Sequence, residues 1–419
     1  MTIADLVQLV TDGQPPMRVQ AFDGSTIEGT DPRLTLNLRN ERALRYLITA
    51  PGDLGMARAY VSGDLELIGA HPGDPYPALR ALASWQFRRP RIGQLPRLVA
   101  DVGLARLLPP APPPQEALPR WRRTVEGLRH SYQRDASAIS RHYDVSNEFY
   151  QYVLGPSMAY TCAVYAKDNL SLEQAQEEKF DLVARKLALG PGMRLLDVGC
   201  GWGGMARHAA QHYGVNVVAV TLSKAQADWA AADIERHSLS AQVRIVHSDY
   251  RDAPGAGYDA ISSIGLLEHV GVANYDSYFR FLRGKLRDGG RLLNHCITRP
   301  DNLGSALPGA FIDRYVFPDG ELTGVGTIIS QAQNAGLEVR HEENLREHYA
   351  LTLQAWCANL VTNWDCCISE VGEATARVWG LYMAACRLGF ETRNVELHQV
   401  VAVKTTADGN ATFPLRPAW

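Results

Sequence analysis

Two kinds of hydrophobic pattern alternate along the second half of the chain. Short runs of strand-forming residues recur, at Arg194–Val198, Asn216–Thr221, Val243–His247, Ala260–Ile264 and Arg291–Ile297. Stretches with apolar residues at helical spacing lie between them, at Met205–Tyr213, Ala225–His237 and Tyr275–Leu286. Because alternating strands and helices build parallel sheets covered by helices, residues from about 140 onward predict an α/β, Rossmann-like doubly wound fold.

The first eighty residues follow a different pattern, with short runs separated by turn signals. Strands are predicted at Met17–Phe22 and Leu34–Leu38, and turns at Asp23-Gly24 and Asp31-Pro32. Helices are predicted at Arg42–Ile48 and Leu54–Tyr60. This mixture predicts a smaller N-terminal α+β domain.

The composition changes between these two regions. Residues 85–141 contain eleven arginines, four acids and no lysine, and Pro109–Pro114 contains five prolines. We therefore expect an N-terminal domain over 1–108, an extended and poorly packed linker over 109–125, and a catalytic domain over 126–419. The arginines fit either a solvated linker or contact with anionic phospholipid headgroups, and both interpretations stay open.

The overall composition excludes several classes of protein. A net charge of −3 argues against a nucleic-acid partner, because nucleic-acid binders usually carry a basic excess. No apolar run approaches the ~20 residues of a membrane span, and the first residues lack the pattern of a secretion signal. Seven cysteines without CxxC pairs are typical of reduced thiols and predict a cytoplasmic location, with no metal site.

A glycine-rich loop follows the first predicted strand of the α/β region. Gly199, Gly201 and Gly204 lie just before a helix, where glycine lets a ligand approach the backbone. The spacing also fits a dinucleotide site, but such a site needs an acid about 20 residues later, and residues 219–221 contain none. Asp197 instead ends the strand, which suits a methyltransferase, where an acid helps to position the methionine part of the cofactor.

Several segments together resemble one enzyme family, and they cover most of residues 140–400 in the family's order. They are His142–Tyr150, Met158–Tyr165, the glycine loop, Val220–Gln226, Ser248–Asp252, Ile264–Gly271, His295–Ile297 and Phe311–Pro318. The sequence resembles the cyclopropane-fatty-acid synthases and mycolic-acid methyltransferases, which use S-adenosylmethionine. Gly55–Leu65 also looks like the N-terminal domain of the longer members, which act on phospholipids.

The resemblance implies a reaction and a set of catalytic residues. Attack of an alkene on the sulfonium methyl leaves a cation on the acyl chain, so the site must orient the reactants, exclude water and supply a base. In the resembling synthases the base is a bicarbonate ion, held by side chains and one backbone group. The matching positions here are Cys162, Glu268, His295, Ile297 (through its backbone) and Tyr349. His348, beside Tyr349, is the alternative at that position.

The resemblance also implies the cofactor contacts. Tyr143, Ser146 and Asp197 are expected at the methionine end, and Gly199 and Gly201 along the loop. Thr221 and Gln226 are expected at the ribose, and Asp249 and Tyr250 at the adenine. Aromatic candidates for an acyl tunnel are Phe149, Tyr165, Phe311, Tyr315 and Phe317, which the sequence does not rank.

The expected function is transfer of the methyl group of S-adenosylmethionine to an unsaturated phospholipid acyl chain, giving a cyclopropane fatty acid, by a cytoplasmic protein at the membrane surface. The expected partners are these acyl chains, a second copy of the chain in a homodimer, and a reductase if the product is methyl-branched. Three alternatives stay open: a methylene or methyl-branched product, N-methylation of a small amine, and a non-catalytic lipid-binding protein.

Overall fold

The computed structural model describes all residues except 88–106, 118–145 and 305–306, and it divides into two compact units. Unit 1 comprises Met1–Leu118, Gly309–Val316 and Trp356–Leu388. Unit 2 comprises Pro119–Pro308, Phe317–Ala355 and Gly389–Trp419. The sequence patterns did not anticipate that two late segments join the N-terminal residues. The predicted boundary at residue 125 stays a prediction, because it lies outside the described residues.

Unit 1 is built on a four-stranded sheet in the order β3-β2-β4-β5. These strands are Thr26–Ile27, Met17–Ala21, Asp31–Leu38 and Leu65–Ile68. A second, two-stranded sheet pairs β1 (Thr11–Asp12) with β6 (Gln86–Phe87). The helices of the N-terminal segment are α1 (Ile3–Val10), α2 (Glu41–Thr49), α3 (Asp53–Val61) and α4 (Tyr76–Ala83). The late segments add α13 (Ala310–Tyr315), the end of α15 (Arg346–Thr362), α16 (Trp364–Val371) and most of α17 (Glu373–Glu391).

One turn prediction in this unit is wrong. Asp31-Pro32 does not form a turn, because it begins β4. The ladder between β2 and β4 shifts there, since Met17 pairs with Asp31 but Arg18 pairs with Thr35. Pro32 lies in this irregular stretch, where its missing N–H removes no regular ladder hydrogen bond.

The described part of the proline-rich stretch is also better packed than expected. The Tyr46 hydroxyl donates to the carbonyl of Ala111 at 2.5 Å, and Arg45 donates to the carbonyl of Leu108 at 2.8 Å. The Glu116 carboxylate is fully buried between Arg58 and Arg314. Residues 107–117 are therefore fastened to unit 1, whereas the predicted linker residues 118–125 lie outside the described part of the chain.

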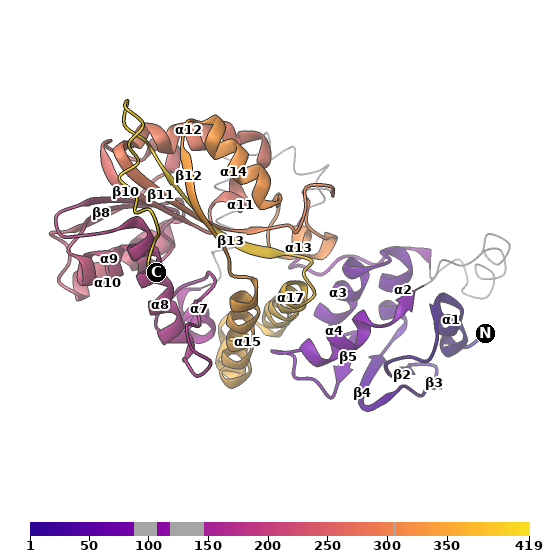
Figure 1. Cartoon of the computed structure of the whole chain (residues 1–419). Coiled ribbons are helices and arrows are strands. Elements are labelled where there is room, and N and C mark those ends of the chain that lie inside the picture. The colour runs from indigo at the N-terminus through magenta and orange to yellow at the C-terminus, as the bar shows by residue number, and fades with distance from the viewer. Residues whose placement is uncertain (88–106, 118–145, 305–306) are drawn as a thin grey trace. The chain divides into compact units, whose positions relative to one another are not determined.

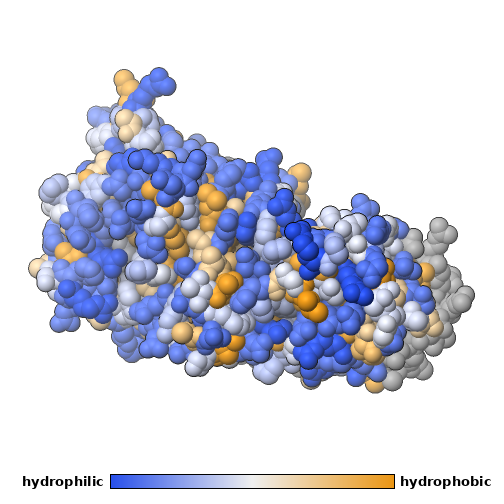
Figure 2. All heavy atoms as spheres, turned by 90° about the horizontal axis from the view of Figure 1, so that it is seen from below, coloured by the Kyte–Doolittle hydropathy of each residue, from blue (hydrophilic) through white to orange (hydrophobic). Residues whose placement is uncertain are grey.

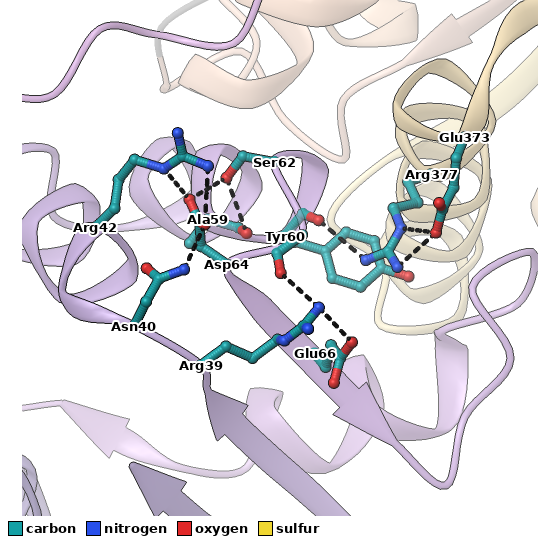
Figure 3. A network of polar contacts seen from close by, with 11 residues as sticks. Arg39, Asn40, Arg42, Ala59, Tyr60, Ser62, Asp64, Glu66, Glu373 and Arg377 are labelled. Atoms are coloured by element: carbon teal, nitrogen blue, oxygen red, sulfur yellow. Dashed lines mark hydrogen bonds and ion pairs between the residues drawn. The ribbon is translucent and has the colours of Figure 1, made fainter. Parts of the chain in front are cut away.

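The segment that resembles the phospholipid-acting synthases has a structural centre at Asp64. This carboxylate is 3% exposed, and it accepts hydrogen bonds from Arg42, from Asn40 and from the Ser62 hydroxyl (Figure 3). Arg377, on α17, donates to the carbonyl of Tyr60 at 3.3 Å (Figure 3). Through these bonds Asp64 joins the start of α2 to the end of α3.

Unit 2 contains a seven-stranded sheet in the order β12-β13-β11-β10-β7-β8-β9. In that order the strands are Glu338–Asn344, Glu396–Val403, Leu286–Thr298, Tyr258–Ile264, Arg194–Val198, Asn216–Thr221 and Val243–His247. The five strands from β11 to β9 run parallel, and β13 is antiparallel to both of its neighbours. The strands and helices predicted for this region are confirmed, with end shifts of a few residues.

Helices cover both faces of this sheet (Figure 1). One core is formed with α12 (Tyr275–Lys285) and α14 (Val325–Asn334), and it includes Leu196, Leu292 and Val400 of the sheet. The other is formed with α8 (Leu172–Leu187), α9 (Gly204–Tyr213) and α10 (Lys224–Arg236), and it includes Leu195, Leu293 and Val401. Neighbouring strand residues enter opposite cores, as expected for a doubly wound sheet. The other helices of unit 2 are α7 (Asn147–Leu154), α11 (Leu267–Val270), the 3₁₀ turns η4 (Tyr250–Asp252) and η5 (Val272–Asn274), and the start of α15.

The surface is mostly polar. Figure 2 shows a largely hydrophilic face with apolar residues scattered in small groups. In the described part of the chain, no helix is long and apolar enough to cross a bilayer.

Candidate active site

The glycine loop connects β7 to α9 in a strained conformation that glycine permits. Gly199 and Gly201 have φ values of 74° and 54°. The amides of Gly199 and Cys200 both donate to the carbonyl of Val220 at 2.9 Å, which ties the loop to the end of β8. A Cβ at Gly199 would lie 3.1 Å from the Cβ of Leu266. The loop therefore approaches the β10–α11 loop closely and leaves backbone amides at the start of a helix.

A pocket lies at the carboxyl ends of β7, β8, β9 and β10, where ligands bind in doubly wound sheets. Seven of the nine predicted cofactor residues line it: Asp197, Gly199, Gly201, Thr221, Gln226, Asp249 and Tyr250. Ser146 is not among the lining residues, and its hydroxyl caps α7 by accepting from the amide of Phe149 at 3.1 Å. Tyr143 lies outside the described residues. The structure thus brings together seven positions that come from three separate stretches of sequence.

Asp197 is the buried acid of this pocket. Its Oδ1 accepts a hydrogen bond from the Ser262 hydroxyl at 2.6 Å, and its Oδ2 has no partner among the described residues. Burial raises the pKa of Asp197 to about 6, although Ser262 and nearby Lys179 act in the opposite direction. A buried carboxylate oxygen that faces a pocket without a partner favours a ligand with positive charge or N–H groups.

The other predicted cofactor residues with polar side chains make hydrogen bonds or ring contacts with their neighbours. The Thr221 hydroxyl donates to Oε1 of Gln226 at 2.8 Å, and both side chains are buried. Asp249 accepts from Nε of Arg251 at 2.7 Å and caps η4. The Tyr250 ring contacts Tyr278 edge-on at 5.3 Å. These lining groups are neutral or charge-balanced, in contrast to Asp197.

Lys179 is the most notable of the lining residues that the sequence did not single out. Lys179 is 1% exposed, and its Nζ donates to the Thr161 hydroxyl at 3.0 Å. Burial lowers the pKa of Lys179 to about 7, although the nearby Cys162 and Asp197 act to raise it. Its position on α8 was the available signal, because Leu172, Gln176, Lys179 and Val183 share the helix face that turns to the sheet.

Glu268 and Ile297, two of the predicted catalytic positions, are in direct contact. The amide of Ile297 donates to Oε1 of Glu268 at 2.8 Å, while Oε2 is buried without a partner among the described residues. Burial raises the pKa of Glu268 to about 7, and the hydrogen bond from Ile297 only partly offsets this effect. A carboxyl group with this pKa can exchange a proton near neutral pH.

His295 lies two residues before Ile297 on β11 and beside the pocket rim. Its carbonyl accepts from the amide of Gly265, a lining residue, at 2.8 Å. Its Nδ1 lies 3.1 Å from Nε2 of Gln399, and its own Nε2 has no partner among the described residues. Burial lowers the pKa of His295, and the nearby lysines 179 and 186 lower it further. The ring is therefore neutral.

The two remaining catalytic candidates lie where residues 158–165 meet the start of α15. The Cys162 thiol donates to the carbonyl of Ala163 at 3.1 Å, and burial raises its pKa, so it stays protonated. The Tyr349 ring is 7% exposed and stacks on Phe390 at 4.5 Å. Nδ1 of His348, the alternative candidate, accepts from the amide of Tyr165 at 3.1 Å. His348 is therefore committed to a structural bond.

The tunnel candidates divide between the units. Phe311 and Tyr315 belong to unit 1, where the Tyr315 hydroxyl donates to Glu116 at 3.2 Å. Phe149, Tyr165 and Phe317 belong to unit 2. Phe149 is fully buried, and Phe317 contacts the pocket residue His269 at 5.5 Å between ring centres.

Comparison with known proteins gives consistent results. Residues 130–400 match the sequence profile of a family described as mycolic acid cyclopropane synthetase. A probable fatty acid methyltransferase of Mycobacterium tuberculosis is 56% identical, over 100% of this chain and 98% of its own length. The cyclopropane-fatty-acyl-phospholipid synthase of Escherichia coli is 37% identical, over 64% of this chain and 68% of its own. A mycolic acid cyclopropane synthase solved in complex with SAH and CTAB has a TM-score of 0.60 and 32% identity, and covers 64% of this chain and 97% of its own.

Proposed function

Since the chain belongs to the mycolic acid cyclopropane synthetase family, we propose that this S-adenosylmethionine-dependent methyltransferase alkylates the double bond of an unsaturated phospholipid acyl chain and forms a cyclopropane ring. Glu268 lies in sequence between the lining residues Leu266 and His269, and His295 is bonded through its carbonyl to the lining residue Gly265. The single observation that carries the proposal is that one atom of each, Oε2 of Glu268 and Nε2 of His295, is buried without a partner among the described residues. They offer one acceptor and one ring nitrogen where the reaction needs a base.

The residues at this position fit a bicarbonate ion. A hydrogen carbonate presents one O–H donor and several acceptor oxygens, so it complements a carboxylate on one side and N–H or S–H donors on the other. Glu268 provides the carboxylate, and we assign donor roles to His295 and the Tyr349 hydroxyl. The Cys162 thiol joins them when it exchanges its bond to the carbonyl of Ala163 for one to the anion. When bound, bicarbonate would supply a base for a proton of the transferred methyl group.

The chain's own residues have three tasks in this proposal. The loop at Gly199 and the free oxygen of Asp197 hold and orient the methyl donor, which when bound supplies an electrophilic methyl on a cationic sulfur. The buried surroundings of Glu268 exclude water, which would otherwise trap a carbocation. Glu268, with its raised pKa, can accept the O–H proton of the hydrogen carbonate at Oε2, which makes that anion a stronger base.

Two observations support a phospholipid as the acyl carrier. The solved mycolic acid synthase is covered over 97% of its own length but matches only 64% of this chain, so part of this chain has no counterpart in it. The relative from Escherichia coli is named a fatty-acyl-phospholipid synthase. We also propose that the protein binds the membrane surface peripherally. The arginines that prompted this proposal, among them Arg88 and Arg89, lie outside the described residues.

Product analysis tests the proposed reaction. Purified protein, methyl-labelled S-adenosylmethionine and bicarbonate are incubated with anionic vesicles of a monounsaturated phospholipid. We expect one added CH2 per acyl chain with upfield ring protons in the NMR spectrum, and pelleting of the protein with the vesicles. Vinylidene protons at the same mass would establish a methylene product instead. Tight cofactor binding without label in lipid would contradict lipid methylation and direct the search to amine acceptors.

Binding of the cofactor should depend on pH through Asp197. A cationic ligand requires the ionised carboxylate, so protonation competes with binding as pH falls through about 6. We expect the Kd for S-adenosylmethionine, measured by calorimetry, to rise by up to about tenfold per pH unit below that value. Protonation of Lys179 as the pH falls through about 7 should also raise this Kd, because it adds positive charge to the pocket. The Asp197→Asn variant should bind S-adenosylmethionine more weakly, and its Kd should no longer change with pH near pH 6. If the Kd of this variant still rises below pH 6, Asp197 is not the group responsible.

A further inference from the structure

We propose that Gln399 is a positioning residue that holds His295 as the neutral tautomer with its proton on Nε2. The fixed Nε2–H then serves as a donor to the anion in the base site. The catalytic consequence rests on the proposed function, whereas the tautomer itself does not.

Gln399 is placed by strand pairing. It lies on β13 directly opposite His295 on β11, and the two residues are 0% and 1% exposed. Its Nε2 is 3.1 Å from Nδ1 of His295, and its Oε1 is 2.8 Å from Nζ of Lys186, on α8. Lys186, itself fully buried, also forms an ion pair with Glu343 on β12. These contacts form a continuous chain from the edge strand of the sheet to the pocket rim.

The lysine determines which way the amide faces. An ammonium group has only donors, so the amide atom toward Lys186 must be the carbonyl oxygen. The amide nitrogen then faces the histidine and donates to it. Nδ1 of His295 is therefore an acceptor and carries no proton, and a neutral imidazole in this state has its proton on Nε2.

The charges around His295 favour the same state. Lys179 and Lys186 on α8 both lower its pKa, in addition to burial. The acid Glu343 is paired with Lys186, and Glu268 on α11 receives the amide of Ile297. A cationic ring would also set its Nδ1–H against the amide protons of Gln399. The histidine is thus suited to donate one hydrogen bond, and it is poorly suited to act as a general base.

Nothing in the described residues receives this donor. Nε2 of His295 is buried without a hydrogen-bond partner, and buried donors in folded proteins are nearly always satisfied. Because the carbonyl of His295 is bonded to Gly265 on the pocket rim, a ligand at this rim is a reasonable acceptor. The hydrogen bond from Gln399 to His295 is similar to the bonds by which neighbouring groups fix the tautomer of metal-binding histidines.

Nitrogen NMR of the wild-type protein with ring-labelled histidine tests the tautomer without any activity measurement. His295 is assigned by comparison with His295→Gln. His398, the neighbour of Gln399, bonds to the Thr298 hydroxyl at 2.7 Å and serves as the internal reference. We expect a protonated Nε2 and an unprotonated Nδ1 for His295 across neutral pH, with Nε2 shifting when bicarbonate is added. Protonation of Nδ1, alone or together with Nε2, would overturn the proposal.

A substitution then tests the functional consequence. In Gln399→Glu the new carboxylate still pairs with Lys186, but toward His295 it can only accept, so the proton moves to Nδ1. We expect at least a tenfold loss of turnover and a raised requirement for bicarbonate, with an unchanged Kd for S-adenosylmethionine. Thr298→Val is the matched control, since it breaks a buried bond between the same two strands on the opposite face and should leave the His295 signals unchanged.

The outcomes separate the two hypotheses. If the proton of His295 moves to Nδ1 in Gln399→Glu but turnover and the requirement for bicarbonate stay as in the wild type, Gln399 has no positioning role. Failure of the wild-type protein to methylate lipid would contradict the proposed function, while the tautomer measurement keeps its meaning. If Gln399→Glu does not fold, the wild-type spectrum still decides the tautomer.

Discussion

Replacing Glu268 by glutamine should slow methyl transfer by about two to four orders of magnitude, the range expected for loss of a positioned acid–base group. The amide can still accept the hydrogen bond from Ile297, which is 2.8 Å from Oε1, so local structure is preserved. Only the ability of Oε2 to exchange a proton is lost. Turnover is measured with labelled cofactor and lipid vesicles, and cofactor binding is measured by calorimetry. The Kd for S-adenosylmethionine should change little.

Glu321→Gln is the matched control for this experiment. Its carboxylate likewise accepts a backbone hydrogen bond, from the amide of Val272 at 2.7 Å. We expect turnover within a few-fold of wild type. Equal turnover of Glu268→Gln and wild type would remove Glu268 from the mechanism, and equal loss in both variants would indicate general damage to this loop region.

Replacing Glu116 by alanine should destabilise unit 1 by about 3–5 kcal/mol, as expected when one partner of a buried ion cluster is removed. The carboxylate is 0% exposed and bonds to Arg58 at 2.7 and 2.8 Å, to Arg314 and to the Tyr315 hydroxyl. The side chains of Arg58 and Arg314 are only 13% and 14% exposed, so both would be left as buried charges without this partner. The cluster is one of several contacts that join α13 to the N-terminal residues, with the bonds of Phe311 to Asp53 and of Arg314 to Ala117.

Hydrogen exchange resolved by peptide measures this effect in each unit separately. Glu28→Ala is the control, because Glu28 pairs with Arg18 on the surface of the same unit, with side-chain exposures of 71% and 44%. Such a pair contributes about 0–1 kcal/mol. Faster exchange is expected in α3 and α13 of the Glu116 variant, with unit 2 unchanged. Similar effects of the two variants would show that the cluster does not secure α13.

Parts of the fold followed from the sequence because their signals are local. The strand runs at Arg194–Val198 and Asn216–Thr221 were recovered with the same ends, and the glycine loop between β7 and α9 has the positive φ values that its glycines suggested. Hydrophobic period and glycine placement act over a few neighbouring residues, so they can be read without knowing the rest of the chain.

Other features depend on contacts between distant residues. The turn predicted at Asp31-Pro32 does not form because Asp31 pairs with Met17 in the sheet, and this pairing outweighs the local preference for a turn. The proline-rich stretch was expected to be poorly packed because consecutive prolines favour an extended chain. Glu116 nevertheless attaches this stretch to Arg58 and Arg314. These residues are far apart along the chain, so a pattern of neighbouring residues could not predict the contact.

The sequence by itself determined the α/β class, the glycine loop and, through family resemblance, the cofactor and a list of candidate residues. Only the tertiary structure decided how those candidates are connected. It placed seven of them on one pocket, buried Oε2 of Glu268 and Nε2 of His295 without partners in the part of the chain that the structure describes, and buried Lys179 and Lys186 on the helix that packs against the sheet. It also brought Gln399, 104 residues from His295 along the chain, to 3.1 Å from its ring. The reason is physical: proton position and pKa depend on burial and on neighbours in space, and folding selects those neighbours from all parts of the chain.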